Sequence, residues 1–106
     1  METKKYTIDF TKVNYYLEMH AVIWHALEFP DYYGCNWSAF WDCLTNMVGD
    51  PIHIEIIGLD VIRRKFDGSA DMIIETLKEF KHNYDDEYAD EITIEIVTEN
   101  GIEIIK

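Results

Sequence analysis

One carboxylate, that of Asp42, follows an unusual concentration of aromatic residues. The run from Phe29 to Thr45 reads Phe-Pro-Asp-Tyr-Tyr-Gly-Cys-Asn-Trp-Ser-Ala-Phe-Trp-Asp-Cys-Leu-Thr. Tyr32, Tyr33 and Trp37 precede Asp42 in this run. Large amphipathic rings beside a charge that can pair are typical of protein-interface anchors. The run therefore predicts a surface that offers a negative charge to another protein.

A long stretch of the chain carries negative charge only. The formal net charge is −12, and no Lys or Arg occurs between Val13 and Ile62. The acidic residues of that span are Glu18, Glu28, Asp31, Asp42, Asp50, Glu55 and Asp60. A purely anionic surface repels nucleic acid and attracts cationic partners. We therefore expect a basic protein partner and no binding of nucleic acid.

Other kinds of chemistry have little support in the residue pattern. Cys35, Cys43 and the four histidines form no Cys-x-x-Cys or His-x-x-x-His pair, and no Gly-rich phosphate loop follows a strand. We expect no metal site, no cofactor and two free thiols, with Cys43 a small, half-buried filler. Anionic surroundings also disfavour the thiolate that a cysteine nucleophile needs. An enzyme would require Asp42 to face a second acid such as Glu79 across a cleft, and we predict no catalytic residue.

Length and composition predict one domain over residues 1–106. Nearly half of the 106 residues are hydrophobic, which is enough for a single core and excludes the composition of disordered chains. The first residues, Met-Glu-Thr-Lys-Lys-Tyr, lack the apolar region of a signal peptide. No apolar stretch approaches the roughly 20 residues of a membrane span. We expect a cytosolic protein that does not bind membranes.

The elements that must position Asp42 follow from hydrophobic spacing. Tyr6, Ile8 and Phe10 alternate with polar residues and predict a first strand. A helix is predicted from Val13 to Leu27, with an apolar stripe of Val13, Tyr16, Leu17, Ile23, Trp24 and Leu27, before Pro30. Asn36 is a good N-cap for a second helix that runs through Met47. On that helix Trp37, Phe40, Trp41 and Leu44 form the apolar stripe, and Ser38, Asp42 and Thr45 lie on the other side.

The second half of the chain alternates strands with helices. Strands are predicted over residues 52–57 and 92–97, and helices over 59–66 and from Ser69 to about Asn83. Asn100-Gly101 followed by Ile102, Ile104 and Ile105 indicates a hairpin and a final antiparallel strand. This order favours an α/β fold in which the core strands are parallel.

The aromatic run resembles a known family. The pattern Pro-x-Tyr-Tyr-Gly-x-Asn-x-x-Ala-x-Trp-Asp-Cys-Leu-Thr, residues 30–45, is similar to the second helix and preceding loop of the barstar family, intracellular inhibitors of the ribonuclease barnase. Weaker similarity extends through Ile96. The resemblance implies a three-stranded parallel sheet packed with about four helices, to which this chain adds a possible C-terminal antiparallel strand.

The resemblance also implies how the run would act. Barstar-like proteins press this helix and loop into the nuclease cleft, where a carboxylate takes the place of an RNA phosphate. Asp42 matches that carboxylate, Tyr32 the tyrosine that packs on the catalytic site, and Thr45 a polar contact at the helix end. Glu79 matches a second acidic contact, and Asn36 either a loop contact or simply the cap. The full expected partner-binding set is Tyr32, Tyr33, Asn36, Trp37, Ser38, Trp41, Asp42, Thr45, Asn46, Met47 and Glu79.

Four positions depart from the family pattern. Barstar has a glutamate at the position of Cys35 and an aspartate at the position of Ser38. It has a glycine at the position of Asn46 and a tryptophan at the position of Met47. This face carries less negative charge than the family pattern, so specificity should depend more on Tyr32, Trp37 and Met47. The function that we predict is inhibition of a basic, barnase-like ribonuclease. The sequence favours a monomer without fixing the oligomeric state, because the tail from Thr98 to Lys106 either covers the sheet edge or pairs with another copy. The alternative is an acidic module that binds a basic partner other than a nuclease.

Overall fold

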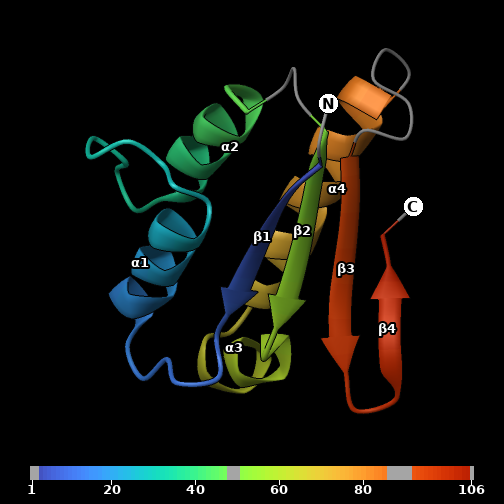
Figure 1. Ribbon diagram of the computed structural model, residues 1–106. Helices are drawn as coiled ribbons and strands as arrows, with labels where there is room; N and C mark the ends of the chain where they lie inside the picture. Colours follow the sequence, from blue (N-terminus) through green and yellow to red (C-terminus); the bar gives the residue numbers. More distant parts are fainter. Residues whose placement is uncertain (1–2, 48–50, 86–91, 106) are drawn as a thin grey trace.

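Strands and helices follow one another in the order expected from the sequence (Figure 1). The computed structural model describes residues 3–47, 51–85 and 92–105. Within these residues the elements are β1 (Lys4–Asp9), α1 (Tyr16–Ala26), α2 (Trp37–Thr45), β2 (Ile52–Ile57), α3 (Leu59–Lys65), α4 (Ser69–Asp85), β3 (Ile92–Thr98) and β4 (Gly101–Ile104). The predicted α/β class, with four helices and a C-terminal antiparallel strand, is confirmed.

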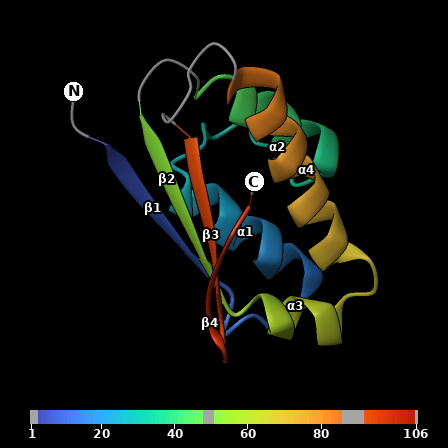
Figure 2. The same cartoon turned by 90° about the vertical axis from the view of Figure 1, so that its right-hand side faces the viewer.

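The strands form one sheet in the order β1-β2-β3-β4, in which β1, β2 and β3 are parallel. Isoleucines stand side by side on one face, because Ile8 pairs with Ile56 and Ile56 with Ile96. Figure 2 shows the four helices on a single side of the sheet. These isoleucines are buried beneath that helical layer. The opposite face of the sheet carries no described helix.

Helix α1 is shorter than predicted, and its predicted stripe is only partly buried: Val13, Ile23 and Leu27 are in the core. It begins at Tyr16 rather than Val13, because the Glu18 carboxylate accepts hydrogen bonds from the backbone N–H groups of Asn14 and Tyr15 and so fixes the N-terminus. The prediction that Tyr16 and Leu17 belong to the core is wrong, since their exposed fractions are 42% and 66%. The buried residues of this helix are Met19, His20 and Ile23.

The end of α1 fixes where the loop before α2 starts. The N–H of Phe29 donates to the carbonyl of Trp24 and the N–H of Glu28 to that of His25, which is the Schellman arrangement. It places Glu28 in the left-handed region, with φ of 57°. The Trp24 indole N–H also donates to the Phe29 carbonyl at 2.9 Å. The chain therefore leaves α1 in one defined direction.

Helix α2 begins as predicted and ends two residues early. The Asn36 side chain accepts a hydrogen bond from the N–H of Ala39 at 2.8 Å and donates one to the carbonyl of Gly34 at 3.1 Å. Of the predicted apolar stripe, Phe40 and Leu44 are buried, whereas Trp37 and Trp41 are half-buried. Packing against α1 and α4 therefore uses only part of each tryptophan.

A tight turn joins β2 to α3 at the opposite end of the molecule from α2 (Figure 1). Gly58 caps α3 with φ of 78°, and a Cβ there would lie 2.8 Å from the backbone nitrogen of Thr11. Only glycine fits such a position. The turn brings the start of α3 against the segment that follows β1.

Candidate functional site

A hollow between α2 and α4 brings together five of the residues expected at the partner-binding surface. Its volume is about 330 Å³, and its lining residues are Trp37, Ser38, Trp41, Asp42, Met72, Thr76 and Glu79. The two helices contact each other directly. The carboxylates of Asp42 and Glu79 thus border one concave surface from two different helices.

Asp42 is exposed, and it pairs with no basic side chain among the described residues. It occupies the C-terminal half of α2, where backbone carbonyls contribute partial negative charge and no basic residue compensates it. Two sources of negative potential therefore add at this end of α2. A cation from outside the chain would be bound favourably here.

The last predicted contacts lie at the C-terminal end of α2. The Thr45 hydroxyl donates to the backbone carbonyl of Asp42 at 2.8 Å, and the side chain of Thr45 is half-buried. Asn46 caps the helix and is exposed, whereas Met47 is half-buried against the core. These three residues continue the surface beyond the hollow rather than lining it.

Two adjacent tyrosines of the loop before α2 face in opposite directions. Tyr32 is 76% exposed, whereas Tyr33 is only 6% exposed. The hydroxyl of Tyr33 lies 2.9 Å from Nδ1 of His20, and its ring packs on Phe29 with centroids 5.2 Å apart. Burial raises the pKa of Tyr33 well above its usual value. Tyr33 thus anchors the loop to the core, and Tyr32 is left available on its surface.

His20 packs against the same loop and the start of α2 from the core side. Its ring centroid lies 4.7 Å from that of Trp37 and 5.2 Å from that of Tyr16. Burial lowers the pKa of His20, which keeps the imidazole neutral at pH 7. Its Nε2 atom is buried without a hydrogen-bond partner among the described residues. A neutral aromatic ring therefore fixes Trp37 at the edge of the hollow.

Comparison with known proteins supports the family indicated by the sequence pattern. The family described as "Barstar (barnase inhibitor)" matches residues 3–97, which is most of the chain. The chain belongs to the barstar family. It is also 33% identical over 70 residues to a Bacillus subtilis protein named "Putative ribonuclease inhibitor YrdF", an alignment that covers 66% of this chain and 77% of that protein.

Within this barstar-family chain, some residues of the hollow were not predicted from the sequence. Met72 and Thr76 line it from α4, on the same side as Glu79. Met72, Thr76 and Glu79 are four and three residues apart and so lie on one helical face. This spacing is the feature of the sequence from which Met72 and Thr76 could have been predicted. Met72 is 41% exposed, so the hollow includes an accessible apolar side chain.

The two cysteines of this barstar-family chain are free thiols, as expected. Cys43 is 5% exposed, and burial together with the nearby negative charge of Asp42 raises the pKa of its thiol. A raised pKa removes the thiolate that nucleophilic chemistry needs. Among the described residues, no group of three or more His, Cys, Asp or Glu side chains is placed to hold a metal ion. No described helix is both long and apolar enough to cross a membrane.

Proposed function

We propose that this chain inhibits a basic ribonuclease by covering its active site with α2 and the loop before it. The observation that carries the proposal is the exposed, unpaired carboxylate of Asp42 beside the hollow between α2 and α4. Membership of the barstar family and likeness to a protein named as a ribonuclease inhibitor support the same role. The chain would then act as an inhibitor in the cytosol rather than as an enzyme.

In this proposal Asp42 takes the place of an RNA phosphate. A nuclease holds polyanionic RNA in a cationic cleft, so the same cleft attracts a chain with a formal net charge of −12. Glu79 adds a second carboxylate across the hollow, and Ser38 contributes a hydroxyl to its lining. Trp37, Trp41 and Met72 supply apolar contact around these charges.

The loop contributes through two residues in different roles. Tyr32, which is 76% exposed, would pack on the nuclease. Tyr33 would act indirectly, because its buried hydroxyl bonds to His20 and holds the loop in place. Asn36 would likewise act as the helix cap, since both ends of its amide already bond to the backbone. Thr45, Asn46 and Met47 would extend the contact at the other end of α2.

Titration of the purified chain into a barnase-like ribonuclease that cleaves a fluorogenic RNA tests this proposal. We expect stoichiometric inhibition by the wild-type chain. Asp42→Ala should weaken binding by more than about 2 kcal/mol, or roughly thirtyfold, because it leaves cations of the nuclease buried and unpaired. Asp67→Ala, which removes an exposed carboxylate beyond α3, is the matched control and should inhibit as the wild type does.

Two results would contradict the proposal. One is a lack of inhibition of every barnase-like or genetically adjacent basic ribonuclease tested. The other is equal inhibition by the wild type and Asp42→Ala. Tight, Asp42-dependent binding to a basic protein that is not a nuclease would instead favour the acidic interaction module.

A further inference from the structure

Strand β4 leaves a row of backbone groups open at the edge of the sheet. Among the described residues it pairs with β3 on one side only, and the N–H of Ile105 donates to the carbonyl of Ile94 at 2.9 Å. In an antiparallel ladder such bonded pairs alternate with unbonded ones, so Glu103 and Gly101 also bond toward β3. The N–H and C=O groups of Ile102 and Ile104 therefore point to the free edge.

This edge lacks two of the residue types that usually prevent an edge strand from pairing. The sequence Gly-Ile-Glu-Ile-Ile, residues 101–105, contains no lysine and no proline. All four residues of β4 are exposed, Ile102 by 59% and Ile104 by 56%. In Figure 2 the helices lie on one side of the sheet and leave the outer edge of β4 uncovered.

The two faces of β4 differ in chemistry. Ile102 lies opposite Val97, and Val97 lies opposite Ile57, so an apolar row crosses the uncovered face of the sheet. Glu103 lies opposite Ile96 and so projects on the helical side. The strand therefore presents isoleucine on one face and a carboxylate on the other, with a period of two residues.

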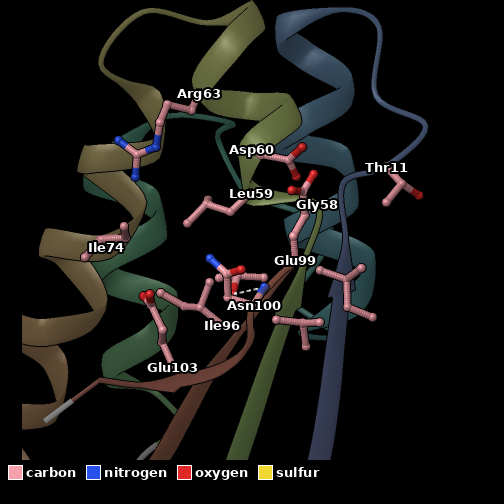
Figure 3. A pocket seen from close by; sticks show the side chains of 13 residues that line it. Thr11, Gly58, Leu59, Asp60, Arg63, Ile74, Ile96, Glu99, Asn100 and Glu103 are labelled. Carbon is pink, nitrogen blue, oxygen red and sulfur yellow. Dashed lines mark hydrogen bonds between the residues drawn. The ribbon is translucent and has the colours of Figure 1, made fainter.

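On the helical side, Glu103 borders a cavity of about 600 Å³ between the hairpin, α3 and α4. Its apolar walls include Leu59, Ile74 and Ile96 (Figure 3). Asp60, Glu99 and Glu103 contribute carboxylates to its lining. Arg63, the one basic residue among its described lining residues, is already paired with Asp71 at 3.0 Å. Among the described residues, neither Glu99 nor Glu103 has an ion-pair partner. The cavity thus favours a cation with an apolar stem.

We propose that β4 binds an extended segment of a second protein as a fifth strand, and that this segment alternates apolar and basic residues. Its apolar side chains would lie beside Ile102 and Ile104, and its basic side chains would lie beside Glu103 at the mouth of the cavity. Such cross-strand pairs stabilise a sheet, and the open N–H and C=O groups supply the backbone bonds.

Charge distinguishes this occupant from a second copy of the chain. Two β4 strands paired so that Ile102 meets Ile104 would place Glu103 opposite Glu103, and each chain has a formal net charge of −12. Strand β4 also lies beyond residues 3–97, the part matched by the family. In Figure 1 β4 forms the right-hand edge of the sheet and α2 lies at the upper left, so both surfaces could be occupied together. The strand site does not depend on the proposed inhibition.

Titration of the ¹⁵N-labelled chain with the end-blocked peptide Lys-Val-Lys-Val-Lys-Val, followed by NMR, tests the strand site. We expect the largest shifts at residues 101–105, and slower exchange of the Ile102 and Ile104 amides. The peptides Glu-Val-Glu-Val-Glu-Val and Lys-Lys-Lys-Val-Val-Val should bind at least about tenfold more weakly, because they lack the matching charge or the period of two.

Two variants separate strand addition from general attraction to an acidic chain. Ile104→Pro removes an N–H that points outward, so it should leave the β3–β4 pairing intact and weaken peptide binding at least about tenfold. Glu103→Lys should weaken it about fivefold, whereas Glu75→Lys, the same charge change on the exposed face of α4, should change it less than about twofold.

Three results would overturn the strand site. The first is the absence of shifts in residues 101–105 at millimolar peptide. The second is equal binding of the two lysine peptides, or equal weakening by Glu103→Lys and Glu75→Lys, since both indicate unspecific attraction. The third is a dimer in sedimentation that Ile104→Pro dissociates, because the occupant of the edge would then be a second copy.

Discussion

His20 is the residue whose titration should be visible in the stability of this protein. It lies beneath the loop that precedes α2, and its neighbours are the rings of Tyr16, Tyr33 and Trp37. No carboxylate is within hydrogen-bonding reach of His20 among the described residues. In the charged form both ring nitrogens carry a proton, so an Nε2–H group would be buried without an acceptor. Burial of the charged ring therefore lowers the pKa of this group.

The free energy of unfolding should fall as the pH drops below about 6.5, the ordinary pKa of histidine. The unfolded chain binds the His20 proton first, so acid favours unfolding until the pH reaches the lowered pKa of the folded state. The slope contributed by this one group is at most about 1.4 kcal/mol per pH unit. Urea unfolding between pH 4.5 and 8 measures it.

His20→Asn is the control for this prediction, because it removes the titration and keeps a polar group near the Tyr33 hydroxyl. The variant should have a flatter profile between pH 5 and 7. Asp9 titrates below this pH range. Hydrogen bonds from Thr11 lower the pKa of its carboxyl group, so its contribution to stability is lost only as the pH falls below 3.8, the ordinary pKa of aspartate. Identical slopes near pH 6 in the two chains would contradict a buried, neutral His20.

Some residue positions could be predicted because interactions with neighbours in the sequence determine them. Asn36 caps α2 as its type and place suggested. In β2 the buried isoleucines alternate with the half-buried His53 and Glu55, as the period of two residues predicts. His20 and Tyr33 could not be placed this way, because polar aromatic residues are stable on either side of a helix or loop. What decides their burial is the hydrogen bond between them, and that bond joins residues 13 positions apart.

At the scale of elements, the left-handed residue after α1 offers a direct test. Glu28 has φ of 57°, a conformation in which a Cβ is unfavourable. Glu28→Gly should therefore be more stable than Glu28→Ala by about 1 kcal/mol, because both remove the carboxylate and only glycine relieves the backbone. The exposed ion pair between Lys4 and Glu28 contributes little, since both side chains are 59% exposed. Urea denaturation of the two variants measures the difference, and equal stability would contradict it.

Element types were predictable throughout, whereas their ends depended on particular hydrogen bonds. Both ends of α1 shifted inward because the Glu18 carboxylate fixes its start and a Schellman turn fixes its end. Helix α4 extends to Asp85, two residues beyond the predicted end. A hydrophobic stripe indicates which face of a helix is buried, but it contains no information on where the last backbone bond forms.

At the scale of the whole molecule, the meeting of α2 with α4 could not be derived from residue spacing. Asp42 and Glu79 belong to segments separated by β2 and α3, and only the family resemblance placed them at one expected surface. The parallel order β1-β2-β3 sets both helices on one side of the sheet, and their packing then creates the hollow. Topology therefore determined which charges share a surface.

Charge acts at the same scale, on the rate of association. With a formal net charge of −12, the chain should be steered toward a basic nuclease over distances comparable to the Debye length. The association rate constant should fall at least about tenfold between roughly 0.01 M and 1 M NaCl, while the dissociation rate changes less. Stopped-flow fluorescence with the inhibited nuclease measures both constants. An association rate that is independent of salt would show that the charge serves another purpose.

The C-terminal strand β4, which lies beyond the family match, should contribute to the stability of the whole sheet. Ile105 is 5% exposed and donates its N–H to the carbonyl of Ile94, so removing every residue after Thr98 deletes this buried side chain and uncovers β3. We expect a loss of about 2–3 kcal/mol in the free energy of unfolding by urea. The truncated chain should also aggregate, because β3 becomes a longer open edge, and light scattering measures this.

Ile105→Ala separates the loss of stability from the aggregation, since it should lower stability and leave β4 paired. A truncated chain as stable as the wild type would show that β4 serves only as a docking edge.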